Sequence, residues 1–292
     1  MQPFTYERPT LVEDAVALLA GAQTWALAGG TDLIPQLKEG RHTAKVIVDL
    51  KHIPQMRTIS RWTDGGWRIG GAVSVTDLAA APGFAREHAG LVAAAQLIGC
   101  LQIQSRATLA GNLCNGAPSA DAVPLLMSLD ARAVIAGADG QRTVPIDGLL
   151  SGPGRTTLVP GEIVTAILLP PRAPCSGARY LRFTPRREMD IAVAGTGVCL
   201  MLGPAGEIRN VRITLASVGP VPIRAIKAEA RLAGDMPSEG LIAEAARIAA
   251  GEARPISDTR ASADYRRQLV EVLTRRALEA TLAEAHMGAE PS

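Results

Sequence analysis

Two glycine-containing segments, far apart in the sequence, place the strongest constraint on what this chain can fold into. Residues 28–33 read Ala-Gly-Gly-Thr-Asp-Leu, and residues 108–112 read Thr-Leu-Ala-Gly-Asn. Glycine allows φ > 0 and lets a ligand approach the backbone closely. Successive N–H groups in such a turn form a concave anion site. We therefore predict that the two loops hold one diphosphate group between them.

Length, composition and charge restrict the class of protein. With 292 residues, the chain can bury a large core, and we expect two or three domains. Its hydrophobic fraction of 47% is ordinary for a globular protein. The net charge is only +2 and no long basic run occurs. The chain therefore lacks the electrostatic footprint of a nucleic-acid-binding protein.

The first residues and the cysteines indicate a cytoplasmic protein. Residues 1–10 include Glu7 and Arg8 and lack an apolar core, so they do not form a signal peptide. No apolar run is long enough to span a membrane. None of the four cysteines belongs to a C-x-x-C pair, which excludes a zinc-ribbon or ferredoxin-type ligand set. Scattered cysteines fit a reducing compartment.

Apolar periodicity predicts a first domain over residues 1–57. A capping-box sequence at residues 10–13 opens a helix that Gly21 ends. Residues 25–27 form a short buried strand that leads into the first loop, and residues 45–50 form a second strand. A helical turn follows the loop between them.

A second domain is predicted over residues 58–172 and a third over residues 178–286. In the second, strand-like runs and short helices surround the second loop, at residues 67–70 (strand), 72–75 (strand), 91–98 (helix), 122–129 (helix), 131–136 and 142–146 (hairpin), and 163–169 (strand). A segment rich in Pro, Ala and Gly, residues 170–177, is the predicted linker. The third domain has three strand-like runs, at residues 178–183, 192–202 and 208–218, and then two helices. This order suggests helices on one face of a sheet.

The two loops resemble the paired flavin-binding loops of the FAD-binding (medium) subunit of the molybdenum hydroxylase family. This family includes the medium subunit of carbon monoxide dehydrogenase and the FAD-binding subunit of xanthine dehydrogenase. Four further stretches match in order, at residues 152–156, 160–163, 186–192 and 265–266. The resemblance implies an α+β protein with the two-subdomain FAD-binding fold of the vanillyl-alcohol oxidase type. A C-terminal α+β domain with a three-stranded sheet and helices would follow.

The resemblance also implies which residues hold the FAD. The implied cofactor-binding residues are Ala26, Leu27, Ala28, Gly29, Gly30, Thr31, Asp32 and Leu33 from the first loop, Thr108, Leu109, Ala110, Gly111 and Asn112 from the second, and Asp121, Val164 and Arg182. Both loops would cradle the pyrophosphate, with donors from the side chains of Thr108 and Asn112 and from the Gly111 N–H.

Several of these residues have alternative roles. By resemblance Asp121 accepts hydrogen bonds from ribityl or ribose hydroxyls, but it also stands where an N-cap would. Asp32 should not face a phosphate; we expect its carboxylate to brace the loop by accepting backbone N–H bonds. Arg106 either neutralises phosphate or is a solvated surface residue. Val164 and Arg182 match positions at the flavin ring, although the family often has lysine in place of Arg182.

No catalytic acid–base set and no metal site emerge from the sequence. The chain lacks G-x-G-x-x-G and a Walker A motif, which argues against a kinase or NTPase. It also lacks G-x-S-x-G and H-E-x-x-H. Cys114 stands alone where some relatives carry a cysteine-rich loop, so no iron–sulfur cluster is expected in this chain. The cofactor would then carry the chemistry, and the protein would supply binding and electrostatics.

The resemblance thus implies an oxidoreductase: the FAD-binding electron-transfer subunit of a heterotrimeric molybdenum hydroxylase. A large subunit would hold molybdopterin and hydroxylate the substrate, a small subunit would hold two 2Fe–2S clusters, and two trimers would form a dimer. Thr31 and Asp32 replace the histidine–serine pair usual in carbon monoxide enzymes, which favours a heterocycle, an aldehyde or another organic substrate. The alternatives are a carbon monoxide dehydrogenase medium subunit, a stand-alone FAD oxidase or reductase, and a non-catalytic interaction protein.

Overall fold

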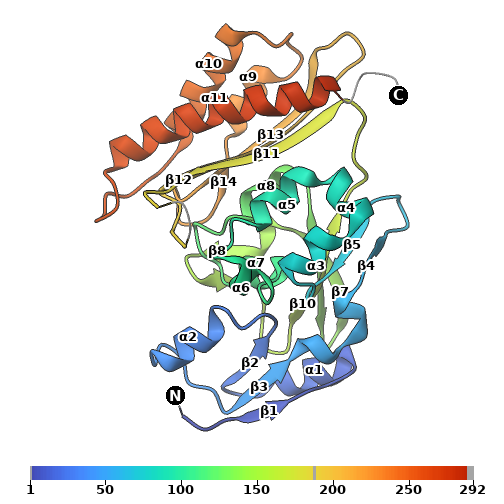
Figure 1. Cartoon of the computed structure of the whole chain (residues 1–292). Coiled ribbons are helices and arrows are strands. Elements are labelled where there is room, and N and C mark those ends of the chain that lie inside the picture. Colours follow the sequence, from blue (N-terminus) through green and yellow to red (C-terminus); the bar gives the residue numbers. More distant parts are fainter. Residues whose placement is uncertain (1, 187–188, 288–292) are drawn as a thin grey trace.

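The computed structural model describes residues 2–186 and 189–287, whose larger sheets stack one above another along the molecule (Figure 1). The first sheet is parallel, in the order β1-β3-β2, and comprises β1 (Thr5–Glu7), β2 (Thr24–Leu27) and β3 (Val46–Asp49). Helix α1 (Val12–Leu19) joins β1 to β2, and α2 (Leu33–Lys38) joins β2 to β3. Two 3-10 turns, η1 (Leu50–His52) and η2 (Pro54–Arg57), lead out of β3.

The second sheet has the order β4-β5-β10-β6-β7, and its paired strands are antiparallel. Its strands are β4 (Ile59–Arg61), β5 (Trp67–Gly70), β6 (Arg132–Gly137), β7 (Gly140–Pro145) and β10 (Ile163–Leu169). The helices between β5 and β6 are α3 (Val75–Ala80), α4 (Pro82–Glu87), α5 (Ala89–Ala95), α6 (Leu101–Gln104), α7 (Leu109–Cys114) and α8 (Val123–Ser128). One apolar core joins these helices to the sheet. Between β7 and β10 lie η3 (Asp147–Leu149) and a small hairpin, β8 (Leu150–Gly152) with β9 (Arg155–Thr156).

The third sheet is antiparallel, in the order β11-β12-β13-β14. Its strands are β11 (Ser176–Phe183), β12 (Ala194–Leu202), β13 (Ile208–Ala216) and β14 (Ile223–Arg224). Three helices complete the domain and share a second large core with the sheet: α9 (Ile226–Leu232), α10 (Glu239–Glu252) and α11 (Ala263–Met287).

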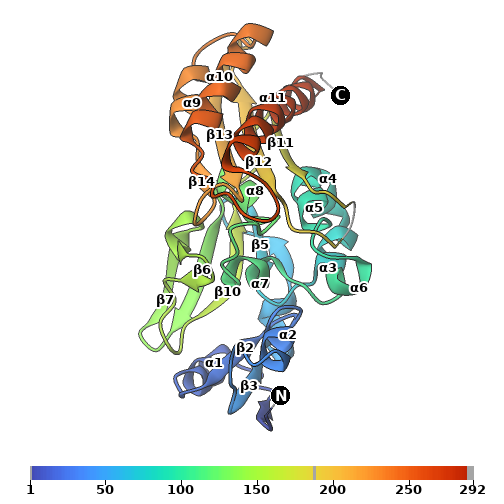
Figure 2. The same ribbon diagram turned by 90° about the vertical axis from the view of Figure 1, so that its left-hand side faces the viewer.

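The third sheet is covered on both faces. Helix α11 runs across β11 and β12, and Figure 2 shows the other helices of the domain on the same side. The opposite face packs on α5 and α8 of the second domain. The approach is close, since a Cβ at Gly90 would lie 2.0 Å from the carbonyl oxygen of Ala178. The helices that follow this sheet in the chain thus lie on one of its faces, as predicted, and α5 and α8 cover the other face.

Two local predictions are wrong. The capping box at residues 10–13 does not form: Leu11 is the N-cap of α1, and no side chain caps the helix. Thr10 lies one residue too early for its hydroxyl to act as the cap. Residues 72–75 are not a strand, because the Asp77 N–H donates to Ser74 Oγ at 3.0 Å and α3 starts at Val75. The sequence also missed the short strands β1, β4, β8, β9 and β14 and the helix α9. Because of β14, the C-terminal sheet has four strands rather than the predicted three.

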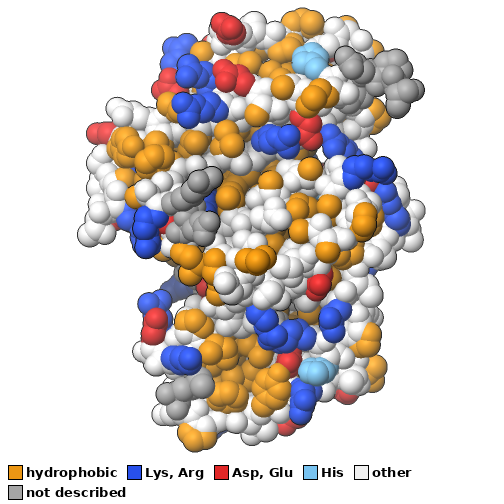
Figure 3. Space-filling view, in the orientation of Figure 1, with side chains coloured by type: hydrophobic (Ala, Val, Ile, Leu, Met, Phe, Trp, Pro, Cys, Tyr) orange, Lys and Arg blue, Asp and Glu red, His pale blue; other side chains and the backbone are white. Residues whose placement is uncertain are grey.

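The visible face of the molecule carries no extended basic patch. Figure 3 shows Lys and Arg side chains in separate groups, with Asp, Glu and apolar side chains between them. Among the described residues, no helix is long and apolar enough to cross a membrane.

Candidate cofactor site

The first loop connects β2 to α2 and exposes a run of backbone donors. Gly30 has φ = +79°, a conformation that glycine adopts without strain. Within residues 2–186 and 189–287, the N–H groups of Gly29, Gly30, Thr31 and Asp32 have no protein hydrogen-bond acceptor. Consecutive N–H groups next to a left-handed residue form an anion-binding concavity.

The second loop is the start of helix α7. Thr108 is its N-cap, and Thr108 Oγ1 accepts a hydrogen bond from the Gly111 N–H at 2.9 Å. Asn112 Oδ1 accepts one from the Ala122 N–H at 3.3 Å. The Gly111 N–H is therefore used inside the loop, contrary to our expectation. The Thr108 hydroxyl proton and the Asn112 amide N–H groups have no acceptor among the described residues and can donate to a ligand.

The two loops meet at the backbone. A Cβ at Gly29 would lie 2.2 Å from the carbonyl oxygen of Arg106, so only glycine fits there. Asn115 donates to Asp32 Oδ1 at 3.3 Å and accepts from Gln36 Nε2 at 3.3 Å. Asp32 thus braces the loop by accepting from the side chain of Asn115, and not from backbone N–H groups as the sequence predicts.

A cavity of about 250 Å³ lies between the loops and brings most of the predicted residues together. The predicted residues that line it are Ala26, Ala28, Gly29, Gly30, Thr31, Asp32, Leu33, Thr108, Ala110, Gly111, Asn112 and Val164. Leu27 and Leu109 are instead buried in apolar cores. Arg106 is exposed and is not part of the lining.

Sequence reasoning missed part of the lining. These residues are Trp25, Gln36, Leu50, Gly71, Ile98, Ala107, Cys114, Asn115, Leu158, Glu162 and Ile163. Glu162 and Ile163 belong to the matched stretch at residues 160–163, which was a signal for them. Asn115 belongs to the continuation of the second loop. The apolar members come from separate elements, and no local pattern marks them.

The charged side chains that line the cavity in the described chain are all acidic. Asp32 and Glu162 line it, but no Lys or Arg does among the described residues. Glu162 is paired with Arg142, whose hydrogen bonds at 2.8 and 2.9 Å hold the pKa of this carboxyl below its usual value. Burial raises the pKa of the Cys114 thiol to about 12, so the thiol is neutral. Negative ligand charge in this cavity would therefore be stabilised mainly by backbone N–H groups.

Asp121 and Arg182 lie outside this lining and pair with each other. Arg182 Nη1 donates to Asp121 Oδ2, and Tyr180 Oη donates to Asp121 Oδ1 at 3.2 Å. Burial raises the pKa of Asp121, an effect that the Arg182 charge opposes. Asp121 does not cap α8, whose N-cap is Ala122 with no side-chain cap bond. The pair joins the segment after the second loop to β11 of the third domain.

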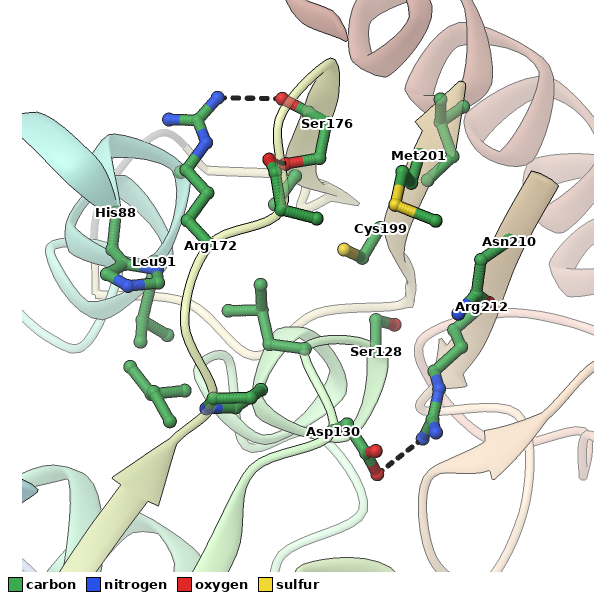
Figure 4. A pocket seen from close by; sticks show the side chains of 18 of the residues that line it. His88, Leu91, Ser128, Asp130, Arg172, Ser176, Cys199, Met201, Asn210 and Arg212 are labelled. Atoms are coloured by element: carbon green, nitrogen blue, oxygen red, sulfur yellow. Dashed lines mark hydrogen bonds and ion pairs between the residues drawn. The ribbon is translucent and has the colours of Figure 1, made fainter. Parts of the chain in front are cut away.

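A second cavity, of about 200 Å³, lies between the third sheet and the helices that pack against it from the second sheet (Figure 4). Figure 4 shows Arg172 turned to Ser176 and Asp130 paired with Arg212 on opposite sides of it. His88 lines this cavity, and its Nε2 atom is buried with no hydrogen-bond partner in the described chain. None of the predicted cofactor residues lies here.

The first cavity has the chemistry that FAD requires. It offers a row of backbone donors for a diphosphate, hydroxyl and amide donors opposite, and apolar walls for ring packing. In the described part of the chain, no cluster of three or more His, Cys, Asp or Glu residues could hold a metal ion.

Comparisons with known proteins identify the family of the chain. The family described as "FAD binding domain in molybdopterin dehydrogenase" matches residues 2–172, and the one described as "CO dehydrogenase flavoprotein C-terminal domain" matches residues 179–281. A putative xanthine dehydrogenase FAD-binding subunit of Escherichia coli (strain K12) is 34% identical over 284 residues, covering 96% of this chain and 97% of the relative.

Solved structures are similar over nearly the whole chain. A chain of carbon monoxide dehydrogenase from Hydrogenophaga pseudoflava, in a form lacking the Mo-pyranopterin moiety, superposes with a TM-score of 0.91 at 32% identity. The match covers 97% of this chain and 99% of that one. A chain of quinoline 2-oxidoreductase from Pseudomonas putida 86 gives a TM-score of 0.90 at 25% identity, covering 97% and 98%.

Proposed function

The chain belongs to the family of FAD-binding subunits of the molybdenum hydroxylases, and from that premise we propose that it is the electron-transfer subunit of a heterotrimer. A large molybdopterin subunit would hydroxylate the substrate. A small subunit would pass electrons from its 2Fe–2S clusters to this chain, which delivers them to NAD⁺, a quinone, a cytochrome or O₂. We propose a cytoplasmic dimer of such heterotrimers.

The observation that supports this proposal most strongly is the row of N–H groups from Gly29 to Asp32, which have no acceptor in the described chain and belong to residues that line a cavity shared with the second loop. These donors, with the Thr108 hydroxyl and the Asn112 amide, would bind the diphosphate. Val164 and the apolar walls would pack against the rest of the cofactor. Bound FAD supplies redox chemistry that links one-electron centres to an external acceptor.

We propose that Asp121 binds the cofactor and that Arg182 holds Asp121 in place. A carboxylate has about four acceptor positions, so Asp121 can accept from a cofactor hydroxyl while it stays paired with Arg182. The pair would then fix the end of the second loop relative to β11. Arg182 does not line the cavity, so it would influence the flavin ring indirectly, by holding Asp121 in place.

The titratable groups around the cavity favour electron transfer over substrate chemistry in this chain. Among the described lining residues, Glu162 is engaged by Arg142 and the Cys114 thiol is neutral. Asp32 is linked to Asn115. The lining therefore offers no general acid paired with a general base, which a stand-alone oxidase or reductase would use on its substrate.

The substrate would bind on the large subunit. The Thr31–Asp32 pair in the first loop favours a heterocycle, an aldehyde or another organic compound, with carbon monoxide as the alternative. To separate these possibilities, each class of compound is added to the assembled complex, and reduction of the flavin is measured by its absorbance.

The test of the proposed function is isolation of this chain from its native cells together with its partners, followed by a visible spectrum and metal analysis. Flavin together with molybdenum and iron supports the subunit proposal. Flavin alone, in a single chain that is active, would contradict it and favour a stand-alone flavoenzyme.

A further inference from the structure

Lys51 lies behind the first glycine loop and holds it directly. The residue follows β3, in the turn η1, and its Nζ donates to the carbonyl oxygen of Ala28 at 2.7 Å. The same ammonium group is paired with Asp49 Oδ1. The side chain of Lys51 is 21% exposed and that of Asp49 only 2%. A largely buried cation is thus fixed between a buried carboxylate and the loop backbone.

The buried carboxylate is itself held in place. Asp49 accepts the backbone N–H of Lys51 at 3.0 Å and the phenolic O–H of Tyr6. The hydrogen bonds from Lys51 and Tyr6 outweigh the effect of burial and lower the pKa of Asp49, so it stays ionised. β1, β3 and the first loop are therefore joined through one charged network.

The bond to Ala28 determines where the next N–H points. The Ala28–Gly29 peptide bond is trans, and in a trans peptide the C=O and N–H groups point in opposite directions. Since the Ala28 carbonyl turns to Lys51, the Gly29 N–H turns away from Lys51. Gly29 lines the cavity, and its N–H has no acceptor within the described residues.

Lys51 also polarises the Ala28–Gly29 peptide group, while Asp49 balances its charge. The lining contains Asp32 and Glu162 but no Lys or Arg among the described residues. The Lys51 ammonium group lies at the carbonyl end of the Ala28–Gly29 peptide dipole and so strengthens the positive end of that dipole, at the Gly29 N–H.

We infer that Lys51 is a positioning residue for the diphosphate of FAD, which orients the Ala28–Gly29 peptide so that its N–H faces the ligand. This inference rests on the proposed function. Lys51 does not line the cavity and acts through the peptide group that it holds.

A purely structural tether would also explain the bond, and the variants must separate the two roles. Lys51→Met keeps the aliphatic stem and removes the ammonium. Lys51→Arg keeps a cation that can donate to Ala28. Lys45→Met removes the same charge from an exposed lysine of the same domain, and the Lys45 ammonium forms no hydrogen bond or ion pair in the described chain.

The experiment uses the full-length chain freed of flavin. FAD is titrated against each variant by quenching of flavin fluorescence, and the melting temperature is measured without FAD. Amide exchange at Gly29 and Gly30 is followed with and without FAD. For Lys51→Met we expect FAD affinity to fall about 10- to 100-fold, as for loss of a hydrogen bond to a charged group. FAD should then protect the Gly29 amide less, at temperatures where the variant is folded.

Lys51→Arg should recover most of the affinity, and Lys45→Met should bind FAD like the parent chain. The inference is overturned if Lys51→Met binds FAD as tightly as the parent. It is also overturned if the affinity loss merely follows a lower melting temperature while the Gly29 protection by FAD is unchanged. If the parent chain itself does not bind FAD, the proposed function fails instead.

Discussion

Gly29 in the first loop lies directly against the carbonyl oxygen of Arg106, at a place where a Cβ would be 2.2 Å from that oxygen. The two loops that line the cavity are therefore in backbone contact. Their spacing, and with it the width of the cavity, depends on the absence of a side chain at one position.

The first prediction concerns this contact. Gly29→Ala should separate the loops, because the new methyl group meets rigid backbone rather than a flexible side chain. We expect a loss of about 1–3 kcal/mol in the free energy of unfolding and at least about a tenfold loss in FAD affinity. Urea denaturation and FAD titration measure the two effects.

Gly240→Ala is the matched control for this variant. A Cβ at Gly240, in α10, would meet nothing within 4 Å, and alanine is the better helix former by about 1 kcal/mol. The control should be as stable as the parent or more so, with unchanged FAD binding. Equal behaviour of the two variants would show that the loops do not need the contact at Gly29.

The second prediction concerns the cap of α7. Thr108→Val keeps the shape but removes the oxygen that accepts the Gly111 N–H, at a residue only 2% exposed. We expect about 1 kcal/mol of destabilisation together with weaker FAD binding. Thr108→Ser retains the acceptor and should stay close to the parent in both assays. If Thr108→Val has the same stability and FAD affinity as Thr108→Ser, the Thr108 hydroxyl has no role in the site.

The third prediction concerns the pair Asp121–Arg182. Both side chains are largely buried, 11% and 7% exposed, and removing one partner leaves the other charge unpaired. Arg182→Met should cost about 3–5 kcal/mol. The double variant Asp121→Asn/Arg182→Met should lose less than the two single losses added together. Chemical denaturation of all four proteins gives the coupling energy.

A different result would change the role of Asp121. If Asp121→Asn lowers FAD affinity strongly while Arg182→Met does not, and the coupling energy is close to zero, Asp121 serves the cofactor alone. The junction between the domains would then not depend on this pair.

The fourth prediction concerns pH and His88. Burial lowers the pKa of His88 from 6.5 to about 4, and nearby Arg172 and Arg61 act in the same direction against Glu87. Between these values the unfolded chain binds a proton that the folded chain does not. The parent therefore loses stability as the pH falls through this window, by about 2 kcal/mol at pH 5.

His88→Leu should lack this contribution. The difference in stability between the parent and the variant, measured by urea denaturation, should shift by that amount in favour of the variant between pH 7.5 and pH 5. Parallel pH curves would mean that His88 titrates normally in the folded chain.

Much of the site follows from local sequence. Gly30 needs a left-handed φ and Gly29 a close backbone approach, and both requirements leave a glycine signature. The strands β2 and β3, which carry the first loop and the residues behind it, follow from short apolar runs. The longer strands β6, β10, β11, β12 and β13 also follow from apolar runs, whereas the short strands β1, β4 and β14 left no such signal.

The rest depends on contacts between distant residues. The link from Asn115 to Asp32, the pairing of Asp121 with Arg182, and the bond from Lys51 to Ala28 join side chains to groups far away in the sequence. No spacing rule marks such partners. Leu109 is part of the loop motif and yet points into the core, because its side chain faces inward from the first turn of α7.

The central claim is that the backbone amides of the first loop, together with side chains of the second, hold the cofactor. Amide hydrogen exchange of the full-length chain with and without FAD tests it most directly. FAD should slow exchange most at Gly29, Gly30, Thr31 and Asp32, with a second protected region at the start of α7. If FAD leaves these amides unchanged and instead protects the segment around His88 at the second cavity, the account of the site is wrong.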